Sequence, residues 1–222
     1  MRWDWIPLSA AALVVGAVAL AFAALLNPVP TGGDAAETVA TVSMAGGRWL
    51  LMGVMYFLAS VALTLGLPAV LSLFAVRARA LGVLAVAVLA IGFVGTSGYA
   101  MLLVFFRALV REDAIRTGSL DSVTNDVGLG IFLWGWVGAF YGGVLLLALA
   151  LLVARRTPVW VPLLLVVFVA LLPLGGTSRA VPVVQTLLMA IAFVRLASVA
   201  VNGASRRVAA SAAARTDSAP AF

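Results

Sequence analysis

A few polar side chains lie inside otherwise apolar stretches of this sequence, and they are the first candidates for a binding site. Thr96, Ser97 and Tyr99 stand close together in one stretch, and Gln185 stands in another. Their hydroxyl and amide groups can hydrogen-bond a neutral lipophilic ligand in a pocket. The same groups can instead bond carbonyls of their own helices and serve packing alone. Both interpretations remain open from the sequence.

Several residue types that carry most enzyme chemistry are missing. The sequence has no cysteine and no histidine, and all 14 basic residues are arginine, so it has no lysine either. These absences exclude a thiolate nucleophile, an imidazole base or metal ligand, and a lysine Schiff base. We therefore expect a protein that is not an enzyme and that uses no cofactor or metal.

Six of the eight acidic residues lie in two polar segments between the predicted spans. They lack the spacing of an EF-hand, so a weak Ca²⁺ site or a catalytic carboxylate pair is a remote alternative to solvated charges that pair with Arg111 and Arg116. The net charge of +6 comes from arginines at segment ends, a topology signal rather than a nucleic-acid-binding face. These acidic residues are Asp34, Glu37, Glu112, Asp113, Asp121 and Asp126.

Composition places the chain in the membrane class. Of 222 residues, 64% are hydrophobic and 10% are charged, with a mean hydropathy of +1.19. Soluble domains carry about 25% charged residues. We predict an all-α integral membrane bundle over 1–202 and a basic Ala/Ser-rich tail over 203–222 that is disordered beyond a helical start. The six predicted spans are 5–26, 49–76, 81–106, 128–154, 158–174 and 180–201.

Arginine counts on the two sides of these spans predict the topology. More arginines fall on the side that holds both termini, which places the N- and C-termini in the cytoplasm. The two longer loops, 27–47 and 107–127, then lie outside. The fifth span is the weakest, because it is short and contains three prolines.

Local signals predict several details of these elements. The Asp34-Ala-Ala-Glu37 spacing predicts a short surface helix near 35–44, and Asp121 or Asp126 can cap the fourth span. Pro68 should kink the second span, with Ser60 and Thr64 satisfying the freed backbone groups. The third helix should continue past the bilayer through a Glu112–Arg116 pair and end at Gly118.

A glycine-rich groove marks the start of the fourth span. Gly128, Gly135 and Gly142 recur every seven residues, and Gly138 lies on the same side, so they share one helix face. Such a face lets another helix approach closely. We predict that it packs within the chain, with a second copy or a membrane partner protein as the alternative.

Several motifs give the chain a family likeness. They are Gly142-Gly143 with the following Leu/Ala run, Ala154-Arg-Arg-Thr-Pro-Val-Trp-Val-Pro162, Arg48-Trp49 and Arg77-x-Arg79. With them the chain resembles small six-span membrane proteins of unknown function from actinobacteria. The resemblance implies a six-helix bundle in the bacterial cytoplasmic membrane and brings no established activity or binding residues.

Two functions are consistent with these features. No ionisable group lies deep in a predicted span, which argues against ion-coupled transport. We expect a non-catalytic multi-pass membrane protein that acts through helix–helix or partner contacts. The alternative is an uncoupled permease or binding protein for a small neutral lipophilic molecule. A closed core favours the first function, and a cavity bordered by Thr96, Tyr99 and Gln185 favours the second.

Overall fold

The computed structural model describes residues 5–29, 34–74, 78–115, 123 and 125–217, the side chains of Ala35 and of 207–217 excepted. Helices form nearly all of this described part, which contains no strand. The helices are α1 (Ile6–Leu26), α2 (Ala35–Met44), α3 (Gly46–Leu71), α4 (Arg79–Arg111), α6 (Val127–Ala154), α7 (Trp160–Ala170) and α8 (Ala180–Asp217), with short 3-10 turns η1 (Ser72–Phe74) and η2 (Leu172–Leu174).

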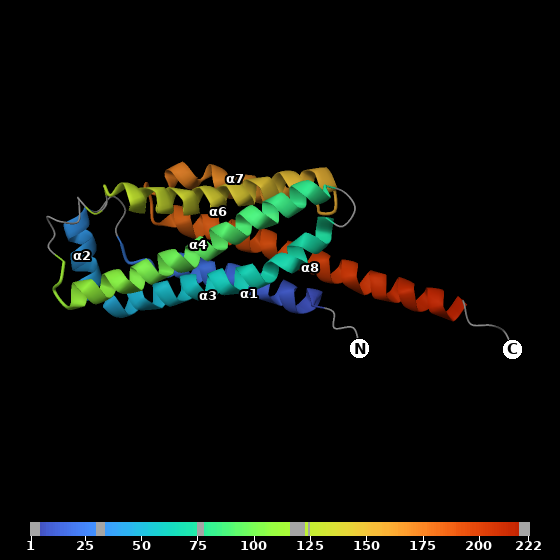
Figure 1. Cartoon of the computed structure of the whole chain (residues 1–222), viewed down its shortest axis with the longest axis horizontal. Helices are drawn as coiled ribbons and strands as arrows, with labels where there is room; N and C mark the ends of the chain where they lie inside the picture. The colour runs from blue at the N-terminus through green and yellow to red at the C-terminus, as the bar shows by residue number, and fades with distance from the viewer. Residues whose placement is uncertain (1–4, 30–33, 75–77, 116–122, 124, 218–222) are drawn as a thin grey trace.

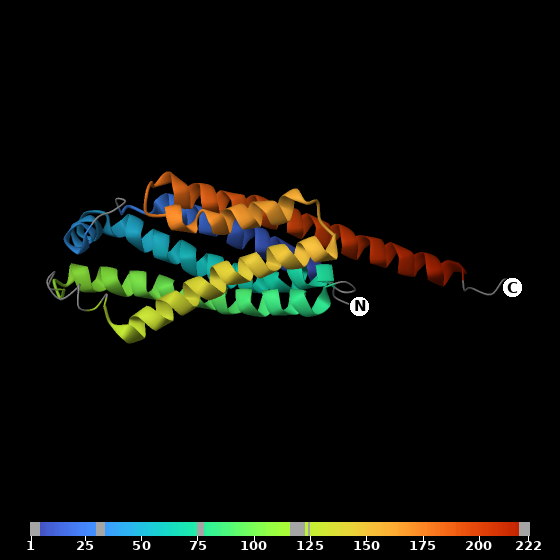
Figure 2. The ribbon, with the colours of Figure 1, turned by 90° about the horizontal axis from the view of Figure 1, so that it is seen from above.

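The long helices pack side by side in a closed ring (Figures 1 and 2). Around this ring α1 contacts α3, α3 contacts α4, α4 contacts α6, α6 contacts α7, α7 contacts α8, and α8 returns to α1. The short helix α2 lies at one end of the bundle, while α1 begins and α8 leaves the bundle at the opposite end (Figure 1). We call these the α2 end and the terminal end.

Both the interior and much of the exterior of this bundle are apolar. Large hydrophobic side chains such as Ile91, Met101 and Trp134 are more than half exposed. Soluble monomers rarely expose so much contiguous apolar surface. Five described helices are long and apolar enough to cross a membrane, namely α1, α3 with η1, α4, α6 and α8 as far as Arg206.

The predicted fifth span is the element that differs most from expectation. Of residues 158–174, α7 forms only 11 residues, and η2 follows it. Eleven helical residues extend about 16 Å, roughly half of a bilayer core. Pro173 has no backbone N–H for a helical hydrogen bond, which agrees with the change from α7 to a 3-10 turn near this residue.

Two other helix ends also differ from expectation. α4 stops at Arg111, before the predicted end at Gly118, because Asp113 adopts a left-handed conformation and the Ala114 N–H bonds the Leu109 carbonyl. Arg116, Gly118 and Asp121 lie outside the described residues. At the C-terminus α8 continues to Asp217, well into the tail where we expected only a helical start.

The predicted helix caps are present. The Asp34 carboxylate accepts a hydrogen bond from the Glu37 N–H at 2.7 Å at the start of α2. The Asp126 carboxylate accepts one from the Leu129 N–H at 2.7 Å at the start of α6. Both acids are therefore used to begin helices.

Candidate functional site

The crossing of α4 and α6 positions the first side chains of the site. A Cβ added at Gly92 would lie 2.6 Å from Phe140 Cα, and one at Gly95 would lie 2.5 Å from Trp136 Cδ1. Only glycine fits at these two points, so the helices approach closely there. The crossing holds Phe140 and Trp136 of α6 against α4.

Thr96 and Trp136 join the same two helices by hydrogen bonds. The Trp136 Nε1–H donates to Thr96 Oγ1 at 3.1 Å, and the Thr96 hydroxyl donates to the Gly92 carbonyl at 3.0 Å. Thr96 is buried, with 2% of its surface exposed. Its hydroxyl therefore bonds its own helix, as the packing interpretation expects, and it also orients the Trp136 indole.

An aromatic cluster continues from this pair towards α3. The Tyr99 ring stacks on Trp136, with centroids 4.6 Å apart and planes at 20°. Tyr56 of α3 meets Tyr99 edge-on at 5.5 Å. Among the described residues, neither the Tyr56 nor the Tyr99 hydroxyl has a hydrogen-bond partner.

A second aromatic pair lies between α6 and α7. The Tyr141 ring stacks on Phe168, with centroids 5.1 Å apart and planes at 15°. Gln185 of α8 donates from Nε2 to the Phe168 carbonyl at 2.7 Å. That carbonyl belongs to the last turn of α7, where helix carbonyls lack helical donors, so Gln185 completes the end of this short helix.

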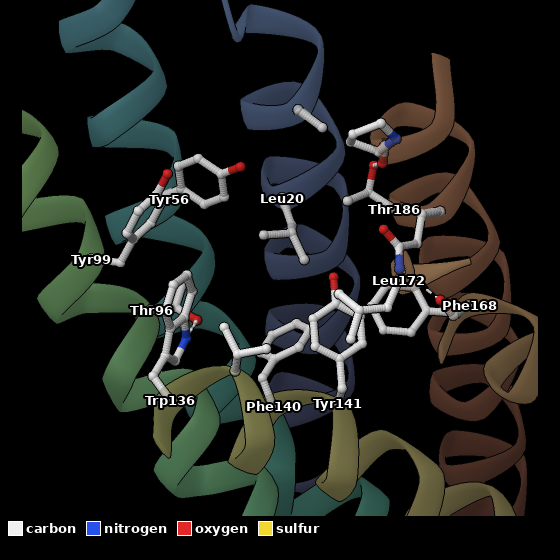
Figure 3. A pocket seen from close by; sticks show the side chains of 14 residues that line it. Leu20, Tyr56, Thr96, Tyr99, Trp136, Phe140, Tyr141, Phe168, Leu172 and Thr186 are labelled. Carbon is white, nitrogen blue, oxygen red and sulfur yellow. Dashed lines mark hydrogen bonds between the residues drawn. The ribbon is translucent and has the colours of Figure 1, made fainter. Parts of the chain in front are cut away.

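These two pairs flank a cavity of about 270 Å³ (Figure 3). Figure 3 shows Tyr99 and Trp136 on one flank, Tyr141 and Phe168 on the opposite flank, and Leu20 between them. All six helices of the ring contribute, and all 3 tyrosines of the chain line this one cavity. The lining residues are Leu20, Ala24, Tyr56, Thr96, Tyr99, Trp136, Val137, Phe140, Tyr141, Phe168, Leu172, Pro182, Gln185 and Thr186.

The cavity lies in the half of the bundle nearer the α2 end. Its lining includes Ala24, close to the last residue of α1, and Pro182, close to the first residue of α8. The other half is a packed core, in which Leu13, Leu89 and Leu147 have no exposed surface. In this conformation the packed core closes the cavity off from the terminal end.

Three of the four predicted pocket residues meet at this cavity. Thr96, Tyr99 and Gln185 line it, although Tyr99 and Gln185 come from helices that are not neighbours in the ring. Ser97 is not among the lining residues and bonds the Val94 carbonyl of its own helix at 2.6 Å. The sequence analysis missed Tyr56 and Tyr141; the concentration of rare tyrosines in apolar spans was the signal that could have found them.

Pro68, the predicted kink of the second span, is not among the residues that line the cavity. The Ser9 hydroxyl of α1 donates to the Leu65 carbonyl at 2.8 Å and accepts from the Ala69 N–H at 2.9 Å, beside Pro68. Ser9 thus bridges backbone groups in the turn that contains this proline. Ser60 instead bonds the Phe93 carbonyl, so it joins α3 to α4.

In the part of the chain that the structure describes, no helix packs on the predicted glycine groove. A Cβ added at Gly135, Gly138 or Gly142 would meet no described atom within 4 Å, and one at Gly128 would meet only the cap residue Asp126 at 3.2 Å. Packing of this face within the chain therefore stays a prediction, and the described residues supply no partner for it. The glycine of α6 that faces a helix is Gly143, whose added Cβ would lie 2.9 Å from the Leu89 backbone nitrogen.

No acidic or basic side chain is among the residues that line the cavity, and Arg48 and Arg107 lie at the α2 end of the bundle. Arg48 donates to the Leu25 and Leu26 carbonyls at 3.0 and 2.8 Å, and Arg107 donates to the Gly46 carbonyl at 2.6 Å. The Arg48 bonds satisfy carbonyls at the end of α1, which lack helical donors, and the Arg107 bond joins α4 to the first turn of α3. Among the described residues, no group of three acidic residues could hold a metal ion.

The described residues therefore form an all-helical bundle with apolar helices of membrane-spanning length and an aromatic cavity. No protein-family model, curated protein or solved structure matches the chain.

Proposed function

We propose that this chain is a membrane protein that binds a small neutral lipophilic molecule in the aromatic cavity, as a binding protein or uncoupled permease. The observation that carries the proposal is the cavity of about 270 Å³ bordered by Thr96, Tyr99 and Gln185. A protein that acts only through helix contacts needs no such space. At ~30 Å³ per water the volume equals about nine waters, which suits a molecule of one or two rings.

The residues that line the cavity support a neutral, lipophilic ligand. No acidic or basic side chain lines the cavity, so an ionic ligand would lose its hydration without a counter-charge. Aromatic and aliphatic surface provides most of the walls, and a few hydroxyl and amide groups provide orientation. The same absence of charge favours an uncoupled process over one driven by protons or sodium.

The position of the cavity favours entry from the α2 end. The packed core on the other side would have to open before a ligand could cross, so binding is the simpler activity and permeation needs a second conformation. In our proposal the bundle lies in the bacterial cytoplasmic membrane with both termini inside. The cavity then faces the outer side, and α7 with η2 returns the chain across the bundle.

A structure of the protein in a lipid bilayer tests this proposal. We expect density for a small molecule or an acyl chain between Tyr99 and Tyr141, enclosed by the six helices. A cavity that collapses in the bilayer, with Tyr56 and Tyr141 packed against Leu20, would leave the proposal without a site.

The open glycine face of α6 supports a second candidate function. Gly135 and Gly138 are exposed on a helix face that no described residue covers. A second copy or a partner helix could pack there, as the sequence analysis allowed. This contact and the cavity lie on different parts of the structure, so both functions can coexist.

A further inference from the structure

The two flanks and the unpaired hydroxyls of the cavity define its ligand more closely, provided that the proposed binding function holds. We propose that the ligand is a planar aromatic molecule of one or two rings that carries a carbonyl or similar acceptor oxygen, as in a naphthoquinone. Three observations carry this inference.

The first observation is the shape of the walls. The Tyr99–Trp136 and Tyr141–Phe168 pairs are each stacked, with planes 20° and 15° apart, and they face each other across the cavity (Figure 3). Phe140 lies between the pairs, 5.4 Å from Tyr141 and 6.1 Å from Phe168. Flat aromatic rings prefer offset-stacked and edge-to-face partners, so such walls favour a flat guest over a globular aliphatic one.

The second observation is an excess of hydrogen-bond donors. Tyr56 and Tyr99 each present a hydroxyl that has no partner among the described residues, on a cavity with little water-accessible polar surface. Hydroxyls in such surroundings are normally bonded. A ligand with an acceptor oxygen would accept from one or both of them, whereas a pure hydrocarbon would leave them unpaired.

The third observation is that the other polar groups are already engaged. Thr96 bonds Gly92 and Trp136, Thr186 bonds the Pro182 carbonyl at 3.0 Å, and the Gln185 nitrogen bonds Phe168. These bonds hold the walls in place. The Tyr141 hydroxyl lies within hydrogen-bonding reach of the Gln185 side chain. The Tyr56 and Tyr99 hydroxyls are therefore the groups that would recognise the ligand.

Titration calorimetry on the full chain in lipid nanodiscs tests the inference with three probes of similar size. 1,4-Naphthoquinone is flat and has acceptor oxygens, naphthalene is flat without oxygen, and camphor has a carbonyl but is globular. We expect naphthoquinone to bind about fivefold or more tightly than naphthalene, the worth of roughly one hydrogen bond. Camphor should bind more weakly still. The absence of cysteine and lysine removes the side chains that quinones most readily modify.

Tyrosine variants test which hydroxyl groups contribute to the affinity for naphthoquinone. Tyr56→Phe and Tyr99→Phe keep the rings and remove the hydroxyls, so one or both should weaken naphthoquinone about fivefold and leave naphthalene unchanged. Ser97→Ala is the matched control, because Ser97 lies on the same helix as Tyr99 but outside the cavity lining. A naphthoquinone with a prenyl tail shows the source of the ring: tighter binding than the tail-free probe indicates a lipid-borne ring, and weaker binding indicates a free one.

Different results would contradict the planar-ligand inference and the proposed binding function. Equal affinity for naphthalene and naphthoquinone, or for camphor and naphthoquinone, would overturn the inference while the cavity remained a binding site. Binding of all probes that persists when Val137 in the cavity wall is replaced by Trp would overturn the proposed function as well.

Discussion

The Trp136 indole donates a hydrogen bond to Thr96 Oγ1 across 3.1 Å, which joins two helices through residues 40 positions apart in the sequence. This bond fixes the indole that Tyr99 stacks upon, and so it fixes one flank of the cavity. Because the surroundings are apolar, a donor that loses this partner finds no substitute easily.

Replacing Thr96 with Val tests the role of this bond. The side chain keeps its branched shape, but the Trp136 N–H loses its acceptor, so we expect a loss of about 1–3 kcal/mol in unfolding free energy. Thermal unfolding of the purified protein in detergent measures it. Ser97→Ala should change stability by no more than ~0.5 kcal/mol, because Ser97 bonds only within its own helix. Equal stability of the two variants would contradict a structural role for the Thr96–Trp136 bond.

Gln185→Leu tests how the short helix α7 is held. The change leaves the Phe168 carbonyl without its donor at 2.7 Å, so we expect a destabilisation of about 1–3 kcal/mol. Thr186→Val at the next position is the control, because that hydroxyl bonds carbonyls of its own helix. Faster hydrogen exchange confined to α7 in Gln185→Leu would locate the effect. Unchanged exchange there would argue that other contacts hold α7.

Gly92→Ala and Gly138→Ala compare a glycine at a close helix crossing with a glycine on an uncovered helix face. An added methyl at Gly92 meets the Phe140 backbone at 2.6 Å, so we expect a loss of about 1–3 kcal/mol from overpacking. At Gly138 the methyl meets no described atom, and alanine should stabilise the helix by up to ~1 kcal/mol. Comparable losses at both positions would show that a helix covers Gly138 in the membrane.

The rotation of α6 about its axis determines which of its faces meets a neighbouring helix. The seven-residue spacing of Gly128, Gly135 and Gly142 does place them on one face, but spacing alone does not say which face meets a neighbour. The structure buries Val144 completely and leaves Gly142 open. For the single chain, we expect Gly142→Leu to be tolerated better than Val144→Leu, as thermal unfolding in detergent would measure. If a second copy packs on the glycine face, Gly142→Leu should instead convert a dimer into a monomer.

Local elements were more predictable than contacts between them. The caps at Asp34 and Asp126 and the positions of the long helices follow from hydropathy and from rules that act over a few residues. Thr96, Tyr99 and Gln185 were found because polar groups stand out in apolar spans. These residues meet one another and Tyr141 because of the way non-neighbouring helices rotate and cross. No local pattern in a single sequence predicts that rotation and crossing.

Cysteine labelling tests the topology, since the chain has no cysteine of its own. Single cysteines at Ala78, Thr157 and Ala210 should resist an impermeant reagent in intact cells and react after lysis. Cysteines at Gly33 and Leu120, which lie outside the described residues, should react from outside. Labelling of position 210 from outside would show that α7 does not return the chain across the bilayer.

The most direct test of the binding cavity compares two Val→Trp variants of α6 in the same calorimetric titration. Val137 lines the cavity, whereas Val153 is 58% exposed on the outer surface of the bundle. Our account predicts that Val137→Trp fills the cavity and weakens naphthoquinone binding at least tenfold, about 1.4 kcal/mol, while Val153→Trp binds as the native chain does. Equal binding by both variants would place the ligand elsewhere and contradict the account.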